Sequence, residues 1–309
     1  MKVLYIQPIH PSGMEKLREK YEVAVAGDTR RETLVKALAD ADAAVTRLTA
    51  VDRGLMAAAP RLKAVAKHGV GVDNIDTEYA KEHGIAVLTT DDANSSTVAE
   101  HTMFAIGALF KRIPMLDGQM RKGNWLSRDL PGARDVMGKT LGIIGFGRIG
   151  QNLARMAGQG FRMKVAVYDP FARREEVEKQ GFAYYDDLLD MAATLDVVSP
   201  HVPLTTQTAG MIGADFLSAM KTESFVVNFA RGGVVNEDAL YEALMSGHIA
   251  GAAVDVFETE PPDIRKPLYC LPNVLLSPHC ATFTEDSRIR MSMRLAEEID
   301  QVLSPRLIR

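Results

Sequence analysis

The sequence contains little cysteine and little net charge. Its 309 residues include two cysteines, Cys270 and Cys280, and their spacing matches neither a disulfide framework nor a metal-ligand pattern. We therefore expect reduced thiols and no bound metal. The 36 basic and 40 acidic side chains give a formal charge of −4, so no large basic surface is available to bind a nucleic-acid backbone.

Membrane and export signals are also missing. No apolar run approaches the roughly 18 residues that a membrane span needs. The N-terminal MKVLYIQPIH lacks the apolar core and the small-residue cleavage site of a signal peptide. These absences predict a cytoplasmic protein without a membrane partner. The remaining composition, 47% hydrophobic and 25% charged, is typical of a globular chain long enough for two domains.

Short apolar runs alternate with amphipathic segments in two series. The first series, in the first ninety residues, is KVLYI, YEVAVA, AAVTR, LKAVAK and IAVLTT. The second, from residue 141, is LGIIGF, VAVYD, LDVVSP, FVVNFA, GAAVDV and VLLSP, with room for one helix between successive strands. Such alternation predicts parallel βαβ units, and six strands are the number in a complete doubly wound dinucleotide-binding domain. The predicted fold class is α/β with two parallel-sheet domains.

Three further segments have a predicted role. Residues 95–112 predict a long buried helix that connects the domains, with Thr97 and Glu100 as a capping box. Residues 118–138 contain helix breakers and the single tryptophan, Trp125, and predict an arm suited to a subunit contact. The last segment predicts an amphipathic helix whose apolar face includes Ile289, Met293, Leu295, Ile299 and Val302.

The stretch LGIIGFGRIGQNLARMA, residues 141–157, runs an apolar strand into three glycines and then into a helical pattern. Gly145, Gly147 and Gly150 match G-x-G-x-x-G. In this pattern the first glycine makes the turn, the second lets the backbone approach a pyrophosphate, and the third lets helix and strand pack closely. The free amides and the dipole of the helix then point at an anion.

Asp169 lies at the end of the next predicted strand. A carboxylate there accepts hydrogen bonds from ribose hydroxyls and repels a 2′-phosphate, which favours NAD over NADP. Arg173 and Arg174 follow closely and weaken this preference. The alternative is a purely structural turn followed by a surface aspartate.

Arg231, Glu260 and His279 follow three predicted strands, and ligands bind beyond the carboxyl ends of such strands. Reduction of a 2-oxo acid leaves an alkoxide that needs a proton from a group titrating near neutrality, as histidine does. A carboxylate orients that imidazole and favours its charged form, and an arginine binds the substrate carboxylate as a planar fork. Each residue has a structural alternative, as surface cation, solvated acid or backbone-bonded histidine. The combination of all three favours catalysis.

Seven motifs, spread over essentially the whole chain, resemble the D-isomer-specific 2-hydroxyacid dehydrogenases, with their phosphoglycerate dehydrogenase-like and hydroxypyruvate or glyoxylate reductase-like members. These motifs are KHGVGVDNID at 67–76, NSSTVAEHT at 94–102, GKTLGIIGFGRIG at 138–150, HVPLTTQT at 201–208, NFARGGVVNEDAL at 228–240, GAAVDVFETEPP at 251–262 and SPHCATFTED at 277–286.

The resemblance implies a domain organisation and an activity. Residues 1–96 with 285–309 would form a flavodoxin-like substrate domain. Residues 97–284 would form a Rossmann NAD-binding domain, with a dimerisation arm near 118–138. The implied activity is hydride transfer between NAD(H) and a small D-2-hydroxy or 2-oxo acid, in a homodimer.

The resemblance also assigns individual residues. Arg231, Glu260 and His279 match the catalytic positions, and Gly69 and Val70 match the loop whose amides receive the substrate carboxylate. The implied cofactor-binding residues are Gly145, Gly147, Arg148, Ile149, Gly150, Asp169, His201, Pro203, Thr208, Ala230 and Asp255. Of these, Asp255 would face the nicotinamide carboxamide, and His201 has a structural role as an equal alternative.

Arg47 and Lys67 lie at predicted strand ends and suit a phosphate, sulfonate or second carboxylate on the substrate. The alternative is that they are solvated surface charges. After His279 the family has a run of small residues that contains glycine, and this sequence has Cys280 there instead. Cys280 either narrows the nicotinamide pocket or is a small buried side chain. Because the sequence ends at Arg309, we expect no appended regulatory domain.

Two rival functions share parts of this sequence pattern. A cofactor-sensing corepressor scaffold shares the fold and the three catalytic residue types. A formate-oxidising relative would replace the glutamate partner of the histidine with glutamine, so Glu260 argues against that activity.

Overall fold

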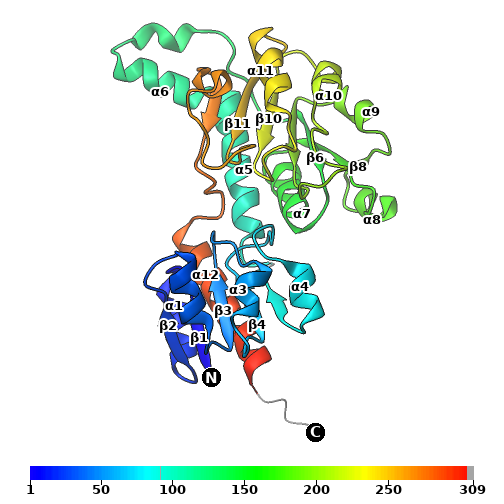
Figure 1. Ribbon diagram of the computed structural model, residues 1–309. Helices are drawn as coiled ribbons and strands as arrows, with labels where there is room; N and C mark the ends of the chain where they lie inside the picture. The colour runs from blue at the N-terminus through cyan, green and yellow to red at the C-terminus, as the bar shows by residue number, and fades with distance from the viewer. Residues whose placement is uncertain (91, 305–309) are drawn as a thin grey trace. The chain divides into compact units, whose positions relative to one another are not determined.

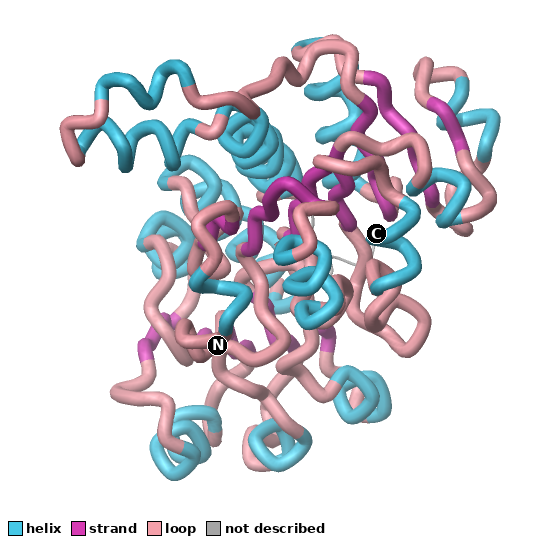
Figure 2. The backbone as a smooth tube through the Cα atoms, turned by 90° about the horizontal axis from the view of Figure 1, so that it is seen from above, coloured by secondary structure: helices cyan, strands magenta, loops and turns pink. Residues whose placement is uncertain are grey.

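The computed structural model describes residues 1–90 and 92–304, which divide into two compact units. Residues 95–281 form the second unit, and the described residues before and after them form the first. Each unit is built on one parallel sheet with helices on both faces (Figures 1 and 2). The predicted fold class, α/β with two doubly wound parallel sheets, is confirmed.

The first unit has five parallel strands in the order β2-β1-β3-β4-β5, which is the flavodoxin-like order. The strands are β1 (Lys2–Tyr5), β2 (Glu22–Val25), β3 (Ala43–Thr46), β4 (Ala64–Lys67) and β5 (Ala86–Leu88). The helices are α1 (Pro11–Arg18), α2 (Arg31–Leu38), α3 (Arg53–Ala57), α4 (Thr77–Glu82) and α12 (Glu285–Leu303). Apolar side chains of α1 and α12 pack on one face of the sheet, and those of α2, α3 and α4 pack on the other.

The C-terminal helix α12 packs against α1, β4 and β5 of this unit. Its buried apolar positions repeat every four residues, at Met291, Leu295, Ile299 and Leu303. The predicted face was wrong at Ile289, which is exposed. The buried stripe lies on the side of α12 that contacts the sheet. The spacing of the apolar residues alone does not determine which side this is.

The second unit has seven parallel strands in the order β12-β11-β10-β9-β6-β7-β8, a Rossmann order with one extra strand at the β12 edge. The strands are β6 (Thr140–Ile144), β7 (Lys164–Tyr168), β8 (Ala183–Tyr184), β9 (Val197–Pro200), β10 (Ser224–Asn228), β11 (Ile249–Val254) and β12 (Val274–Leu276). The helices are α5 (Ser95–Lys111), α6 (Ile113–Arg121), α7 (Arg148–Arg155), α8 (Arg174–Glu178), α9 (Leu188–Ala192), α10 (Ala214–Ala219) and α11 (Glu237–Met245). Single helical turns of other types are η1 (Trp125–Asp129), η2 (Met156–Gly160) and η3 (Pro267–Cys270).

Three details of the second unit differ from the sequence prediction. The strand β8 was missed because two residues are too few to show a periodic pattern. Between β11 and β12 the described chain has only the 3₁₀ turn η3 instead of an α-helix, in a segment where prolines such as Pro261 and Pro262 have no amide to donate. The helix α5 begins at Ser95, so Thr97 lies buried inside the first turn and is not the residue that caps it.

The segment from α6 to η1 projects from the second unit as an arm (Figures 1 and 2). The helix α6 buries none of its side chains. Trp125 and Leu126 are 62% and 72% exposed. An apolar group this exposed is typical of a surface that contacts another molecule.

Among the described residues, no helix has both the length and the apolar character needed to cross a lipid bilayer.

Candidate active site

Two of the three predicted catalytic side chains meet at the carboxyl end of the second sheet. His279 follows β12, Glu260 lies in the loop after β11, and His279 Nδ1 is 2.8 Å from Glu260 Oε2. The other carboxylate oxygen of Glu260 accepts a hydrogen bond from the Phe257 amide at 3.1 Å. Both side chains are partly exposed. The carboxylate is therefore fixed by the backbone on one side and orients the imidazole on the other.

The backbone at His279 is strained. Its φ is 49°, a left-handed value that side chains with a Cβ adopt at a cost. The His279 amide donates to Ser277 O at 3.1 Å, which closes a tight turn. This turn directs the side chain of His279 toward Glu260.

The third side chain, Arg231, follows β10 in a loop that touches the loop of Glu260. A Cβ on Gly232 would lie 1.8 Å from Phe257 O, so the two backbones meet at a place where only glycine fits. The amide side chain of Asn228 donates to Arg231 O at 3.0 Å and accepts from the Ala230 amide at 3.2 Å. The structure therefore joins the loops that carry all three residues, and within them the side chains of Glu260 and His279 contact each other directly.

Asp255 organises the loop that carries His279, a role that sequence reasoning missed. Its carboxylate is 1% exposed and accepts from Ser277 Oγ at 2.6 Å and from the Cys280 and Ala281 amides at 2.9 Å each. Burial and this carboxylate raise the pKa of the Cys280 thiol. The thiol is therefore kept protonated next to the loop, as a small side chain.

The glycine turn has the geometry of a phosphate cradle. Gly145 has a φ of 93°, and a Cβ on it would lie 2.8 Å from His201 O. A Cβ on Gly150 would lie 2.2 Å from Gly145 O, so helix and turn pack tightly there. In contrast, a Cβ on Gly147 would meet no described atom within 4 Å. The space in front of Gly147 is open, and the first amides of α7, at Arg148 and Ile149, begin beside it. These residues fit a dinucleotide.

Asp169 lies at the end of β7 and ties this turn to the sheet. Its Oδ2 accepts from the Phe146 amide at 2.7 Å and its Oδ1 from the Phe171 amide at 2.8 Å. The two arginines that weakened the NAD preference both have acidic partners. Arg173 pairs with Glu176, and Arg174 pairs with Glu178 and Asp186 and stacks on Tyr184.

The remaining predicted cofactor residues lie in the loops that follow β9 and β10. The His201 amide donates to Ile144 O at 2.7 Å, its Nε2 is 3.1 Å from Ser199 Oγ, and burial lowers its pKa to about 4. Its buried Nδ1 has no hydrogen-bond partner in the described part of the chain. The Thr208 hydroxyl donates to Pro203 O at 2.6 Å and so shapes this loop. Ala230 is buried after β10.

The predicted substrate residues lie in the first unit, at the carboxyl ends of β3 and β4. Arg47 lies with its guanidinium 4.3 Å from the centre of the Phe283 ring, and its buried Nε has no partner among the described residues. Lys67 Nζ donates to Arg47 O and, at 2.8 Å, to Asn74 Oδ1. These two cations are therefore connected, and Lys67 fixes the strand end that carries Arg47.

The neighbouring glycine loop contains a buried imidazole that sequence reasoning missed. Gly69 has a φ of 146° and Val70 is exposed. His68 is 7% exposed, and burial together with Arg47 and Arg288 lowers its pKa to about 4. The sequence signal for this was the position of His68 directly after a buried strand.

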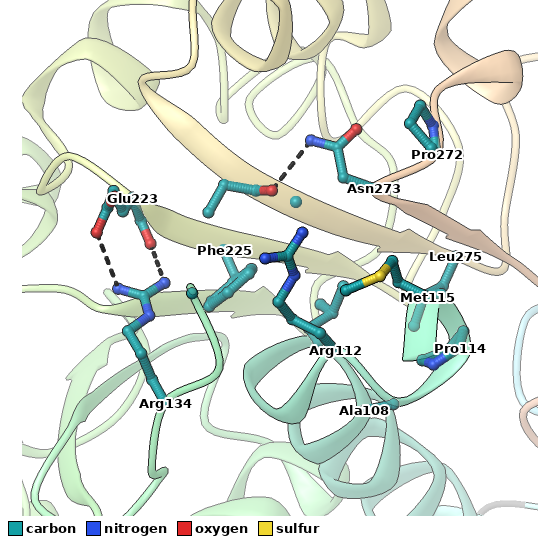
Figure 3. A pocket seen from close by; sticks show the side chains of 14 residues that line it. Ala108, Arg112, Pro114, Met115, Arg134, Glu223, Phe225, Pro272, Asn273 and Leu275 are labelled. Carbon is teal, nitrogen blue, oxygen red and sulfur yellow. Dashed lines mark hydrogen bonds and ion pairs between the residues drawn. The ribbon is translucent and has the colours of Figure 1, made fainter. Parts of the chain in front are cut away.

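A cavity of about 360 Å³ lies elsewhere in the second unit, at the amino ends of β10, β11 and β12 (Figure 3). Arg112, Arg134 and Phe225 line it, Arg134 pairs with Glu223, and Asn273 donates to Ala250 O. Because the predicted catalytic side chains follow the carboxyl ends of the same strands, this cavity is separate from the candidate active site.

Comparison with known proteins places the chain in a family. Residues 103–281 match the model described as "D-isomer specific 2-hydroxyacid dehydrogenase, NAD binding domain". A glyoxylate reductase of Thermococcus kodakarensis is 40% identical over 308 residues, which cover 96% of this chain and 92% of that protein. A D-3-phosphoglycerate dehydrogenase of Methanocaldococcus jannaschii is 40% identical over 304 residues, covering 98% of this chain and 57% of that protein. The chain thus spans just over half the length of this dehydrogenase.

The chain also superposes closely on solved structures. The NADPH-dependent glyoxylate/hydroxypyruvate reductase of Sinorhizobium meliloti superposes with a TM-score of 0.88 at 31% identity, covering 98% of this chain and 95% of that one. A protein of Thermus thermophilus superposes with a TM-score of 0.90 at 32% identity, covering 98% of this chain and 97% of that one.

The fold and the matched model define the class of proteins with a Rossmann-type NAD-binding domain. Within that class, the chain belongs to the D-isomer specific 2-hydroxyacid dehydrogenases. The predicted family is confirmed, and the match to its NAD-binding domain covers residues 103–281. The relatives from Thermococcus kodakarensis, Methanocaldococcus jannaschii and Sinorhizobium meliloti are named as a dehydrogenase or as reductases, and they give no support to the corepressor alternative.

Proposed function

We propose that the protein transfers a hydride between NAD(H) and a small D-2-hydroxy acid or its 2-oxo acid. The observation that carries this proposal is the 2.8 Å contact between His279 Nδ1 and Glu260 Oε2, in the unit that matches the family's NAD-binding domain. An imidazole held by a carboxylate is the proton donor that reduction of a ketone needs.

When bound, the nicotinamide supplies or accepts the hydride. Because Nδ1 of His279 is engaged by Glu260, Nε2 is the atom left to donate a proton to the forming alkoxide, or to accept it in the reverse direction. The Arg231 guanidinium binds the substrate carboxylate and polarises the reacting carbonyl. In the substrate-binding domain, residues 1–96 with 285–309, the amides of Gly69 and Val70 would offer hydrogen bonds to a substrate carboxylate.

The dinucleotide pyrophosphate would bind in the open space at Gly147, against the first amides of α7. Asp169 would accept the adenosine ribose hydroxyls, and its charge disfavours a 2′-phosphate. The pairing of Arg173 and Arg174 with acids supports NAD over NADP. Pro203, Thr208, Ala230 and Asp255 would line the rest of this site, with His201 packed behind the glycine turn.

The substrate would carry a second polar or anionic group. The Arg47 guanidinium stacks on Phe283, and its Nε has no hydrogen-bond partner among the described residues. Both observations support a contact with an anion at the end of β3. Lys67 contributes by holding that strand end.

The exposed apolar side chains of the arm support a homodimer, with the arm near 118–138 as the contact. The assembly is expected to act in the cytoplasm.

A spectrophotometric screen tests the function. The purified protein is mixed with NADH, or with NADPH, and with hydroxypyruvate, glyoxylate, phosphohydroxypyruvate or sulfopyruvate in turn. We expect oxidation of NADH with at least one of these acids, and none in a parallel preparation of His279→Gln. The absence of turnover on all four acids would contradict the proposal.

A further inference from the structure

Two acidic side chains near the candidate active site bind each other's backbone. The Glu237 amide donates to Glu258 Oε1 at 3.2 Å, and the Glu258 amide donates to Glu237 Oε1 at 3.0 Å. Glu237 is the first residue of α11, and Glu258 lies two residues before Glu260. We name this reciprocal pair the carboxylate clasp.

A single lysine bridges the two carboxylates of the clasp. Lys266 Nζ is 2.6 Å from Glu237 Oε2 and 3.3 Å from Glu258 Oε2. The Tyr269 hydroxyl donates to the same oxygen of Glu237 at 2.6 Å. Although burial opposes its charge, the two carboxylates raise the pKa of Lys266. Since Glu237 is only 4% exposed, two neighbouring carboxylates there need such a cation.

The clasp joins the two loops that carry catalytic side chains. The loop of Arg231 runs from the end of β10 to Glu237, and its backbone meets Phe257 at Gly232. The amide of Phe257 holds Glu260 Oε1, and Glu260 Oε2 holds His279. A shift of Glu258 is therefore transmitted through the adjacent Phe257 to the carboxylate that orients the imidazole.

Stability alone is a weak explanation for this arrangement. The buried Glu237 loses its hydration, while the side chains of Lys266 and Glu258 are 30% and 40% exposed, so that water screens their attraction. The net gain in stability from such an ion pair is small. Its hydrogen bonds, in contrast, are directional and fix one relative position of the two loops.

We propose that Glu237, Glu258 and Lys266 are positioning residues, which hold the Arg231 loop against the Glu260 loop so that guanidinium, carboxylate and imidazole act on one substrate. This inference rests on the proposed function. Misplacement of catalytic groups by about 1 Å can cost about 100-fold in rate, so a loosened clasp affects turnover more than binding of the dinucleotide.

The substitution Lys266→Met tests the clasp, with kcat and KM measured for the best keto acid across a range of pH. We expect kcat to fall about tenfold or more, with the Kd of NADH unchanged in a fluorescence titration. The alkaline limb of the pH–rate profile is expected to move to lower pH, because the imidazolium loses part of its carboxylate support. A purely structural role would lower the melting temperature and leave the pH profile in place.

The matched control is Arg265→Met, the adjacent residue, whose exposed guanidinium pairs with Asp263 on the same loop. It should leave kcat and the pH profile as in the wild type. Glu258→Gln is the second test variant: it keeps an acceptor for the Glu237 amide but loses the charge, so a smaller change in the same direction is expected. It replaces Lys266→Met if that variant does not fold.

The possible outcomes are distinct. A wild-type protein without turnover refutes the proposed function and this inference with it. An active wild type combined with an unmoved pH profile in Lys266→Met and Glu258→Gln, or with the same loss in Arg265→Met, overturns the clasp alone.

Discussion

His279 Nδ1 lies 2.8 Å from Glu260 Oε2, although the two residues belong to loops that follow different strands. The contact depends on three anchors. The Phe257 amide fixes the glutamate, Asp255 fixes the loop after β12, and a left-handed backbone turns His279 toward its partner. An orientation held by so many backbone contacts is what proton transfer at a defined atom requires.

Replacement of the imidazole should abolish most of the activity. His279→Gln keeps a polar side chain but provides no group that titrates near neutrality, so we expect turnover to fall by about 100-fold or more. The Kd of NADH, measured by fluorescence, should stay within twofold of the wild type. His83→Gln, in an exposed histidine that stacks on Tyr79 in the first unit, is the matched control and should retain full turnover. Equal turnover in His279→Gln and the wild type would remove this histidine from the mechanism.

Gly147 and Gly150 lie at the helix end of the glycine turn, and their substitution by alanine should have different effects on stability and on NADH affinity. Gly147→Ala adds a methyl group into open space at a φ of −71°, so the melting temperature should not fall. The methyl group would nevertheless occupy the approach of the pyrophosphate, and NADH affinity should drop about tenfold or more, about 1.4 kcal/mol. Gly150→Ala places its methyl group 2.2 Å from Gly145 O and should lower the melting temperature. If Gly147→Ala binds NADH as tightly as the wild type does, the pyrophosphate does not approach here.

The carboxylate of Asp169 should set the cofactor preference. Asp169→Asn keeps an acceptor for a backbone amide of the turn but removes the negative charge that repels a 2′-phosphate. We expect the ratio of kcat/KM for NADH over NADPH to fall about tenfold, about 1.4 kcal/mol. Arg173→Gln, which removes a cation paired with Glu176, should change this ratio little. A wild type that prefers NADPH would contradict this account of Asp169.

The buried imidazole of His68 should make the first unit less stable in acid. Its folded pKa is about 4, against 6.5 for the free side chain, because burial and the charges of Arg47 and Arg288 oppose protonation. Between these values the unfolded chain binds more protons, so stability falls as pH falls, by about 3 kcal/mol when the pH reaches the folded pKa.

Melting temperatures of the wild type and of His68→Asn, measured near neutral pH and near pH 5, test this effect. The variant should lose less stability than the wild type on acidification. His201, whose pKa burial also lowers to about 4, acts with the same sign in the second unit, so His201→Asn provides an independent comparison. Parallel pH dependence in all three proteins would show that neither imidazole is neutral in the folded state.

The apolar side chains of the arm should hold two copies together. The double substitution Trp125→Ser and Leu126→Ser removes the two exposed side chains of η1, and sedimentation velocity should then show half the mass of the wild type with an unchanged circular dichroism spectrum. Phe171→Ser, at a residue that is 91% exposed outside the arm, is the control and should leave the mass unchanged. A wild type that sediments as a monomer would contradict the proposed homodimer.

Features that depend on neighbours along the chain are predictable from the amino-acid sequence alone. Alternating apolar runs specify parallel βαβ units, because a strand and a helix bury their apolar side chains with different periods. The glycine turn was recognisable because Gly145, Gly147 and Gly150 meet backbone and helix constraints within a few residues. Elements too short to show a period, such as β8 and η3, escaped this reasoning.

Contacts between distant segments depend on how the strands assemble into a sheet. Nothing in the sequence near Asp255 indicates that its carboxylate holds the loop of His279, or that Glu237 and Glu258 bind each other's amides. These contacts arise because parallel strands bring their carboxyl ends to one edge of the sheet, whatever their separation in the chain. The buried side of helix α12 is likewise set by the sheet that it covers. Burial of an apolar stripe stabilises the fold only where another surface packs against it.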